Sequence, residues 1–190
     1  GYDDNADSDI EPPVIESMYL NHESFSNGDQ VNESPMLIAR ISDNRSINLS
    51  TAGIGHQMLL TLDGSKSYTN VSEYYTPDAN GYASGIINYP LSNLSDGEHT
   101  LRLRVWDSSG NSAESFINLN VKQGLSPTIF DIYTDANPAY TEANFYVNHN
   151  RPDAIITVTL TIYDLWGRPQ WETTTTGRSD MFQSFPITWD

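Results

Sequence analysis

The sequence predicts an all-β protein built from two consecutive immunoglobulin-like β-sandwich domains. Short segments carry apolar residues at every second position, which is the period of a half-buried strand. Asn, Asp and Gly clusters separate these segments at regular intervals, as turns do in a sandwich. Tyr, Trp and Phe make up 11% of the residues, and aromatic residues favour strands.

The first domain is expected over residues 12–123, after an acidic linker or tail at residues 1–11. Pro12 and Pro13 stiffen the chain before a strand at 14–20. Further strands are predicted at 36–42, 56–62 and 85–91. The Asp63-Gly64 pair favours a tight hairpin turn.

The clearest strand of the first domain covers residues 98–106. Its residues Leu101, Leu103 and Val105 alternate with polar residues, which is typical of an antiparallel strand with one buried face. A turn at 107–111 then leads into a return strand whose core face carries Ile117, Leu119 and Val121.

The second domain is expected over residues 124–190. Residues 122–127, at the boundary between the two domains, are expected to form a linker. Its strands are predicted at 128–133, 143–149, 155–164, 170–175 and 184–189. The run from Ile155 to Tyr163 is rich in β-branched residues, which strongly favours a strand. Five strands make an incomplete sandwich, so we expect this domain to be truncated at its end.

Composition excludes several classes of function. The chain has 9 Lys and Arg against 25 Asp and Glu, a net charge of −16, so a nucleic acid or an anionic membrane is a poor partner. No apolar run reaches the ~18 residues of a transmembrane helix. Because cysteine is absent, the chain contains no disulfide, no thiolate metal site and no cysteine nucleophile.

No catalytic constellation is visible in the sequence. A Gly-x-Ser-x-Gly nucleophile motif is missing, and nothing marks any Ser-His-Asp set or carboxylate pair as catalytic. The four histidines, His22, His56, His99 and His149, are too far apart to predict a metal site. His56 and His99 begin predicted strands and are expected to bond to loops.

Two binding hypotheses remain, each with a structural alternative. Asp107 and Asn111 share one turn, and Asp43-Asn44 is placed at a sandwich pole, so these residues are weak calcium candidates; Asp and Asn also stabilise turns on their own. Tyr74, Tyr75 and Tyr82 form the proposed aromatic surface for a carbohydrate, although such residues also cover a sheet or an interface. No other metal or cofactor is predicted.

Motifs in the first domain resemble a known family. The block Gly53-Ile-Gly-His56 with Leu62-Asp-Gly64 is followed by Leu94-Ser-Asp-Gly-Glu-His-Thr-Leu101 and Val105-Trp-Asp107. Together they resemble the region that follows the catalytic domain in PorU-type proteins, the gingipain-like cysteine peptidases that act as sortases of the type IX secretion system.

The second domain resembles the terminal β-domain of the same family. Asn137-Pro138, Phe145 and Ile162-Tyr-Asp-Leu-Trp-Gly-Arg168 match its pattern. In two respects the sequence departs from that pattern. Ala136 stands where proline is usual, and the sequence stops at Asp190, where the family continues through a Gly-rich hairpin and its last strands.

The resemblance implies a non-catalytic segment of an enzyme. In this family the peptidase domain uses a Cys-His pair to remove C-terminal signals from cargo, which it attaches to anionic lipopolysaccharide. The implied partners are the chain's own upstream peptidase domain and outer-membrane secretion proteins, at the extracellular face of the outer membrane or in a secreted form. Two alternatives stay open: a carbohydrate-binding or adhesin-like surface module, and the C-terminal sorting domain of another secreted protein.

Overall fold

The computed structural model describes residues 9–50, 56–79, 81, 83–151, 154–180 and 182–190. These residues form an all-β protein, as the sequence predicts, with one short 3-10 helix, η1 (Ser72–Tyr74). The chain divides into two compact units, Gly1–Gly124 and Leu125–Asp190. In the described part of the chain, no helix has the length and apolar character needed to cross a membrane.

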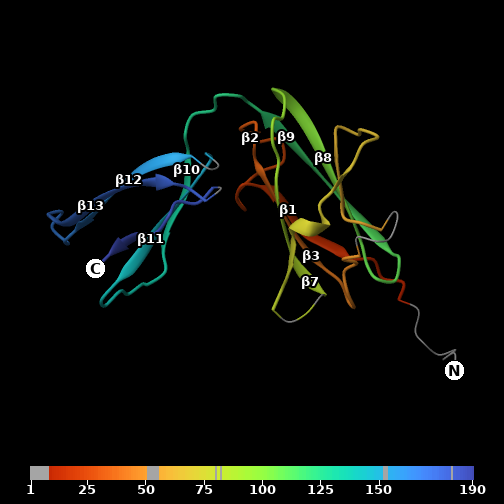
Figure 1. The fold of residues 1–190 in the computed structure, drawn as a ribbon, viewed down its shortest axis with the longest axis horizontal. Coiled ribbons are helices and arrows are strands. Elements are labelled where there is room, and N and C mark those ends of the chain that lie inside the picture. Colours follow the sequence, from red (N-terminus) through yellow and green to blue (C-terminus); the bar gives the residue numbers. More distant parts are fainter. Residues whose placement is uncertain (1–8, 51–55, 80, 82, 152–153, 181) are drawn as a thin grey trace. The chain divides into compact units, whose positions relative to one another are not determined.

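The first unit is a sandwich of two sheets (Figure 1). One sheet has the order β1-β3-β7-β6, with β1 at Val14–Leu20, β3 at Met36–Ser42, β7 at Ser84–Pro90 and β6 at Tyr75–Pro77. The other has the order β2-β9-β8-β4-β5, with β2 at Gln30–Val31, β9 at Ser112–Val121, β8 at Gly97–Trp106, β4 at Leu59–Leu62 and β5 at Thr69–Asn70.

The core of the first unit lies between these sheets. As predicted, every second residue points inward: Leu101, Leu103 and Val105 on β8 are fully buried. Leu37, Ala39 and Ile41 on β3 face them from the other sheet and belong to the same apolar cluster. This burial is the main force that holds the two sheets together.

Turn residues fix the positions where strands end. Asp63 and Gly64 both adopt positive φ, and Ser65 donates its backbone N–H to the Leu62 carbonyl, which closes the predicted tight turn after β4. Since a side chain rarely tolerates positive φ, Gly is favoured at position 64.

One feature of the first unit was not predicted. Strand β2 is only two residues long and pairs in parallel with β9, with Val31 opposite Val121. The chain therefore passes from one sheet to the other between β1 and β2. A two-residue strand has no periodicity, so its sequence carries no signal.

The second unit contains two small antiparallel sheets. One has the order β10-β11-β14, with β10 at Ile129–Thr134, β11 at Ala143–His149 and β14 at Ile187–Trp189. The other is a hairpin of β12 (Ile155–Tyr163) and β13 (Pro169–Arg178). On the hairpin, the hydroxyls of Thr157 and Thr176 lie 2.8 Å apart, and those of Thr159 and Thr174 lie 2.9 Å apart. Such cross-strand pairs stabilise a hairpin.

We expect that truncating a buried side chain on the paired strands β8 and β4 destabilises the first unit. Leu103 is 0% exposed, so Leu103→Ala leaves a cavity and should lower the free energy of unfolding of the first unit by about 2–5 kcal/mol, measured by urea denaturation. The matched control is Leu165→Ala, because Leu165 is 99% exposed and its truncation should change stability by less than about 0.5 kcal/mol. Equal effects of the two variants would contradict this account of the core.

Candidate functional site

Three carboxylates gather at one pole of the first sandwich, and we call this cluster the acidic pole. Asp43 directly follows β3, Asp107 directly follows β8, and Asp9 lies ahead of β1. One oxygen of each residue lies within 4.8 Å of the others. The sequence predicts Asp43 at a sandwich pole and Asp107 in a turn, but it does not single out Asp9, which lies in the predicted acidic linker or tail.

Asp107 is fully buried and organises the β8–β9 turn. Its Oδ1 accepts the backbone N–H groups of Ser109 (2.9 Å) and Asn111 (2.7 Å). The Asp107 N–H in turn donates to the Asn111 carbonyl. This is the turn-stabilising role that short acidic side chains commonly play.

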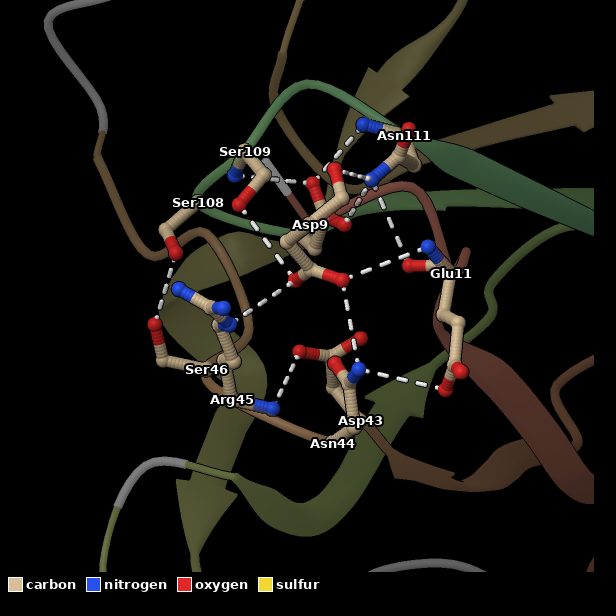
Figure 2. Close-up of polar contacts among 10 residues, drawn as sticks. Asp9, Glu11, Asp43, Asn44, Arg45, Ser46, Ser108, Ser109 and Asn111 are labelled. Atoms are coloured by element: carbon tan, nitrogen blue, oxygen red, sulfur yellow. Dashed lines mark hydrogen bonds and ion pairs between the residues drawn. The ribbon is translucent and has the colours of Figure 1, made fainter. Parts of the chain in front are cut away.

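Asp9 ties the segment ahead of β1 to the pole, and its side chain is only 2% exposed. Figure 2 shows it between the loop that carries Asn44 and Arg45 and the turn that carries Ser109. Its Oδ1 accepts Asn44 Nδ2 at 3.2 Å, and its Oδ2 lies 3.8 Å from Arg45 Nε. The Asn44 hydrogen bond is the main reason that the pKa of Asp9 is lowered, so this group is ionised at neutral pH.

Asp43 has one satisfied oxygen and one unsatisfied oxygen. Its Oδ2 accepts the Arg45 backbone N–H at 2.9 Å. Its Oδ1 is buried and has no hydrogen-bond partner. A buried carboxylate oxygen without a hydrogen-bond donor is energetically costly.

Asn111 presents the nitrogen of its amide to the acidic pole. Its Nδ2 donates to Asp107 Oδ2 at 2.7 Å and to the carbonyl oxygens of Asp9 (3.1 Å) and Glu11 (3.3 Å). In this arrangement Asn111 is a hydrogen-bond donor that joins the turn to the N-terminal segment. Its sequence-based role as a calcium ligand stays a prediction.

Tyr74 and Tyr75, the two described members of the predicted aromatic surface, differ in exposure. Tyr75 on β6 is 8% exposed, so it lies in the core rather than on the surface. Tyr74 is 42% exposed and meets Tyr89 edge to face, with ring centroids 4.8 Å apart. Tyr82 lies outside the described residues. Carbohydrate stacking therefore stays a prediction for Tyr74. The ring of Tyr75 is buried and does not present a face to a sugar.

Trp106 belongs to a separate group on the outer face of β8. The Arg104 guanidinium lies 4.4 Å from the centroid of the Trp106 ring, and the His56 ring lies 4.5 Å from it. Arg104 also lies 3.5 Å from Glu114 on β9. These contacts cover part of the indole ring.

His99 forms a Ser-His-Asp set that the sequence did not single out. Its Nδ1 lies 2.7 Å from Asp63 Oδ2, and its Nε2 lies 2.7 Å from the Ser95 carbonyl and 3.3 Å from Ser95 Oγ. The predicted bond to a loop is therefore confirmed for His99. The alternation of β8 does predict that His99 is buried, because His99 lies two residues before Leu101 and four before Leu103, on the same inward face of the strand.

The geometry of His99 favours a structural cross-link over catalysis. Burial by itself lowers the pKa of His99, but the hydrogen bonds to Asp63 and the Ser95 carbonyl, with the Asp63 charge, outweigh it and raise the pKa. Both ring nitrogens face acceptors, so each carries a proton in the favoured form. A doubly protonated ring has no free lone pair with which to activate a serine.

The comparisons with known proteins identify one informative similarity. No protein-family model and no curated protein matches the chain. Among solved structures, PorU from Porphyromonas gingivalis, described as dimeric and latent, is similar with a TM-score of 0.66 and 32% identity. The match covers 100% of this chain and 18% of that chain, so this chain spans less than a fifth of PorU.

A second solved structure, CopC from Methylosinus trichosporium OB3b, matches with a TM-score of 0.35 and 16% identity, over 58% of this chain and 98% of that chain. A TM-score this low carries no argument about fold or function. The similarity to PorU, by contrast, confirms the resemblance that the sequence motifs predict.

We expect the His99 cross-link to make stability depend on pH. Because the folded pKa of His99 is raised above 6.5, its contribution is full below that value and is lost as pH rises through the raised pKa. The contribution of this cross-link to the free energy of unfolding should therefore fall as pH rises above about 6.5. Asp63→Asn should lower the pKa of His99, measured by NMR titration. A pKa at or below 6.5 in the unsubstituted chain would contradict the cross-link.

Tyr75 provides a test of whether its hydroxyl has any binding role. Burial raises the pKa of Tyr75 to about 12, and its hydroxyl has no hydrogen-bond partner. Tyr75→Phe should therefore leave the melting temperature unchanged or raise it, while Tyr75→Ala should lower the free energy of unfolding by about 3–5 kcal/mol. A loss of more than about 1 kcal/mol in Tyr75→Phe would show that the hydroxyl is needed.

Proposed function

Because the chain is a PorU-like segment, we propose that it serves as a non-catalytic part of a PorU-type sortase, where it supports the peptidase domain and contacts outer-membrane secretion partners. The observation that carries the proposal is the 32% identity to PorU over the whole chain. On this proposal, the parent protein cleaves C-terminal sorting signals and attaches cargo at the cell surface.

The chemistry of the chain supports a non-catalytic role. Cysteine is absent, so cysteine peptidase catalysis does not reside in this chain. The Ser95-His99-Asp63 set is engaged in holding a loop against β8. A rigid sandwich with loops at fixed positions is suited to docking rather than to bond cleavage.

Among the described residues, more large apolar side chains are exposed in the second unit than in the first. Exposed large apolar side chains occur on both of its sheets and in its loops; they are Ile129, Ile132, Tyr133, Tyr140, Ile155, Tyr163, Leu165 and Trp166.

The β12–β13 turn holds two of these residues in a defined place. Leu165 is 99% exposed and Trp166 is 79% exposed. Asp164 fixes the turn, because its Oδ1 accepts the N–H groups of Trp166 and Arg168 and its Oδ2 lies 2.7 Å from Arg168 Nε. An ordered pair of exposed apolar side chains can bind a partner at low entropic cost.

The test uses the full-length parent protein in its bacterial host. Leu165→Ser combined with Trp166→Ser should leave peptidase activity on a soluble signal peptide unchanged. The same variant should reduce co-purification with outer-membrane proteins and the amount of cargo on the cell surface. The reason is that these side chains contribute to no core, so their loss affects contacts rather than folding.

The control is Phe116→Ser, which removes an exposed aromatic residue from the first unit. It should change neither peptidase activity nor co-purification. If the double variant at 165 and 166 retains normal co-purification and surface cargo, the contact role of this turn is refuted. If the parent protein has no peptidase activity, the sortase assignment itself fails.

A further inference from the structure

We propose that the acidic pole of the first unit is a calcium site, with Asp9, Asp43 and Asp107 as its protein ligands. The proposal does not depend on the sortase assignment. It rests on three features of the described residues: the spacing of the carboxylate oxygens, the unsatisfied oxygen of Asp43, and the net charge of the cluster.

The spacing fits one ion. Calcium binds carboxylate oxygens at about 2.3–2.6 Å, so two oxygens on the same ion lie at most about 5 Å apart. The three oxygens of the acidic pole all lie within 4.8 Å of one another. Magnesium binds at about 2.0–2.1 Å and demands near-octahedral geometry, so the looser calcium sphere suits this spread better.

The second feature is the unpaired oxygen of Asp43. Asp43 Oδ1 is buried and has no hydrogen-bond donor, although its partner oxygen is satisfied by the Arg45 N–H. In Figure 2 the free oxygen of Asp43 points toward Asp9. A cation bound between these carboxylates would give that oxygen the electrostatic partner that the protein does not supply.

The hydrogen bonds that Asp107 accepts leave a lone pair for a metal. On Asp9 that lone pair is on Oδ2, which accepts Ser109 Oγ at 3.3 Å, because Oδ1 accepts both Asn44 Nδ2 and the Glu11 N–H. Each carboxylate oxygen has two lone pairs, so Asp107 Oδ2 can accept Asn111 Nδ2 and still bind an ion. The donors also fix the orientation of the carboxylates. Asn44 holds Asp9, and the Ser109 and Asn111 N–H groups hold Asp107, as outer partners do at metal sites.

The charge of the cluster favours a divalent ion. Three carboxylates face one guanidinium, that of Arg45, 3.8 Å from Asp9 Oδ2. The net charge of these four groups is therefore two negative units, which a single Ca²⁺ neutralises. The side chains of Asp9 and Asp107 are nearly inaccessible to solvent, so water screens their repulsion poorly. Calcium prefers six to eight oxygen ligands, so water would supply the ligands that the three carboxylates do not.

A bound ion would join three distant segments of the chain. Asp9 precedes β1, Asp43 lies between β3 and β4, and Asp107 lies between β8 and β9. Calcium would therefore fasten the segment ahead of β1 to the pole of the sandwich. The backbone amides of residues 9–11 should become more protected from hydrogen exchange when calcium is added.

The test uses the whole chain after treatment with a chelator and removal of the chelator. Calcium chloride alone should bind one site per chain in isothermal titration calorimetry, with a dissociation constant of about 10⁻⁴ M or tighter. At 5 mM calcium chloride the melting temperature of the first unit should rise by about 5 °C or more. Sodium chloride at equal ionic strength should not reproduce the rise.

Asp43→Asn is the informative variant, because it removes a ligand charge and leaves an oxygen to accept the Arg45 N–H. It should abolish the calcium response and raise the melting temperature of the metal-free chain, since repulsion at the pole is relieved. The matched control is Glu98→Gln, which removes one charge near the opposite end of β8 and should retain calcium binding.

Three results would overturn the proposal. The first is the absence of heat and of any melting shift with millimolar calcium in the unsubstituted chain. The second is an equal response in Asp43→Asn and the unsubstituted chain. The third is an equal rise with sodium chloride, which would show screening of repulsion rather than binding. Asp9→Asn, which leaves the β8–β9 turn intact, checks the result if Asp43→Asn does not fold.

Discussion

The pairing of β8 with β9 is the interaction on which the first unit depends. Its ladder runs without a shift from Gly97 opposite Val121 to Trp106 opposite Ser112. One face of this hairpin supplies the centre of the apolar core. Its two ends carry the two polar clusters, His99 with Asp63 at one end and Asp107 at the other. A regular ladder thus fixes the separation of two sites that have no contact in common.

Much of the fold could be predicted because it depends on short-range patterns. The strands at 36–42 and 143–149 were predicted to the residue, since alternation and flanking turn residues mark them clearly. The Asp63-Gly64 turn is equally local, because its backbone requires positive φ at both residues. The inward position of His99 follows from the same alternation as that of Leu101.

The features that sequence reasoning missed all depend on contacts between distant segments. Tyr75 follows an exposed tyrosine in sequence, and only its pairing on β6 and its packing against Gly85 bury the ring. Asp9 reads as part of a solvated acidic run until the structure places it beside Asn44 and Ser109. The periodicity of a sequence does not indicate which distant segments are neighbours in space. The sequence therefore draws attention to Asp43 and Asp107 separately but does not predict that they form one cluster with Asp9.

The short parallel pairing of β2 with β9 has a mechanical consequence. Asp9 and Asn111 lie at one end of the first unit, whereas Val121 pairs with Gly97 at the other end, so the chain enters and leaves this unit at opposite poles. A pulling force along the chain would therefore act parallel to the strands. The bonds that join Val31 to Lys122 and Asp29 to Asn120 would then be loaded together in shear instead of opening one after another. Such a unit resists extension parallel to its strands.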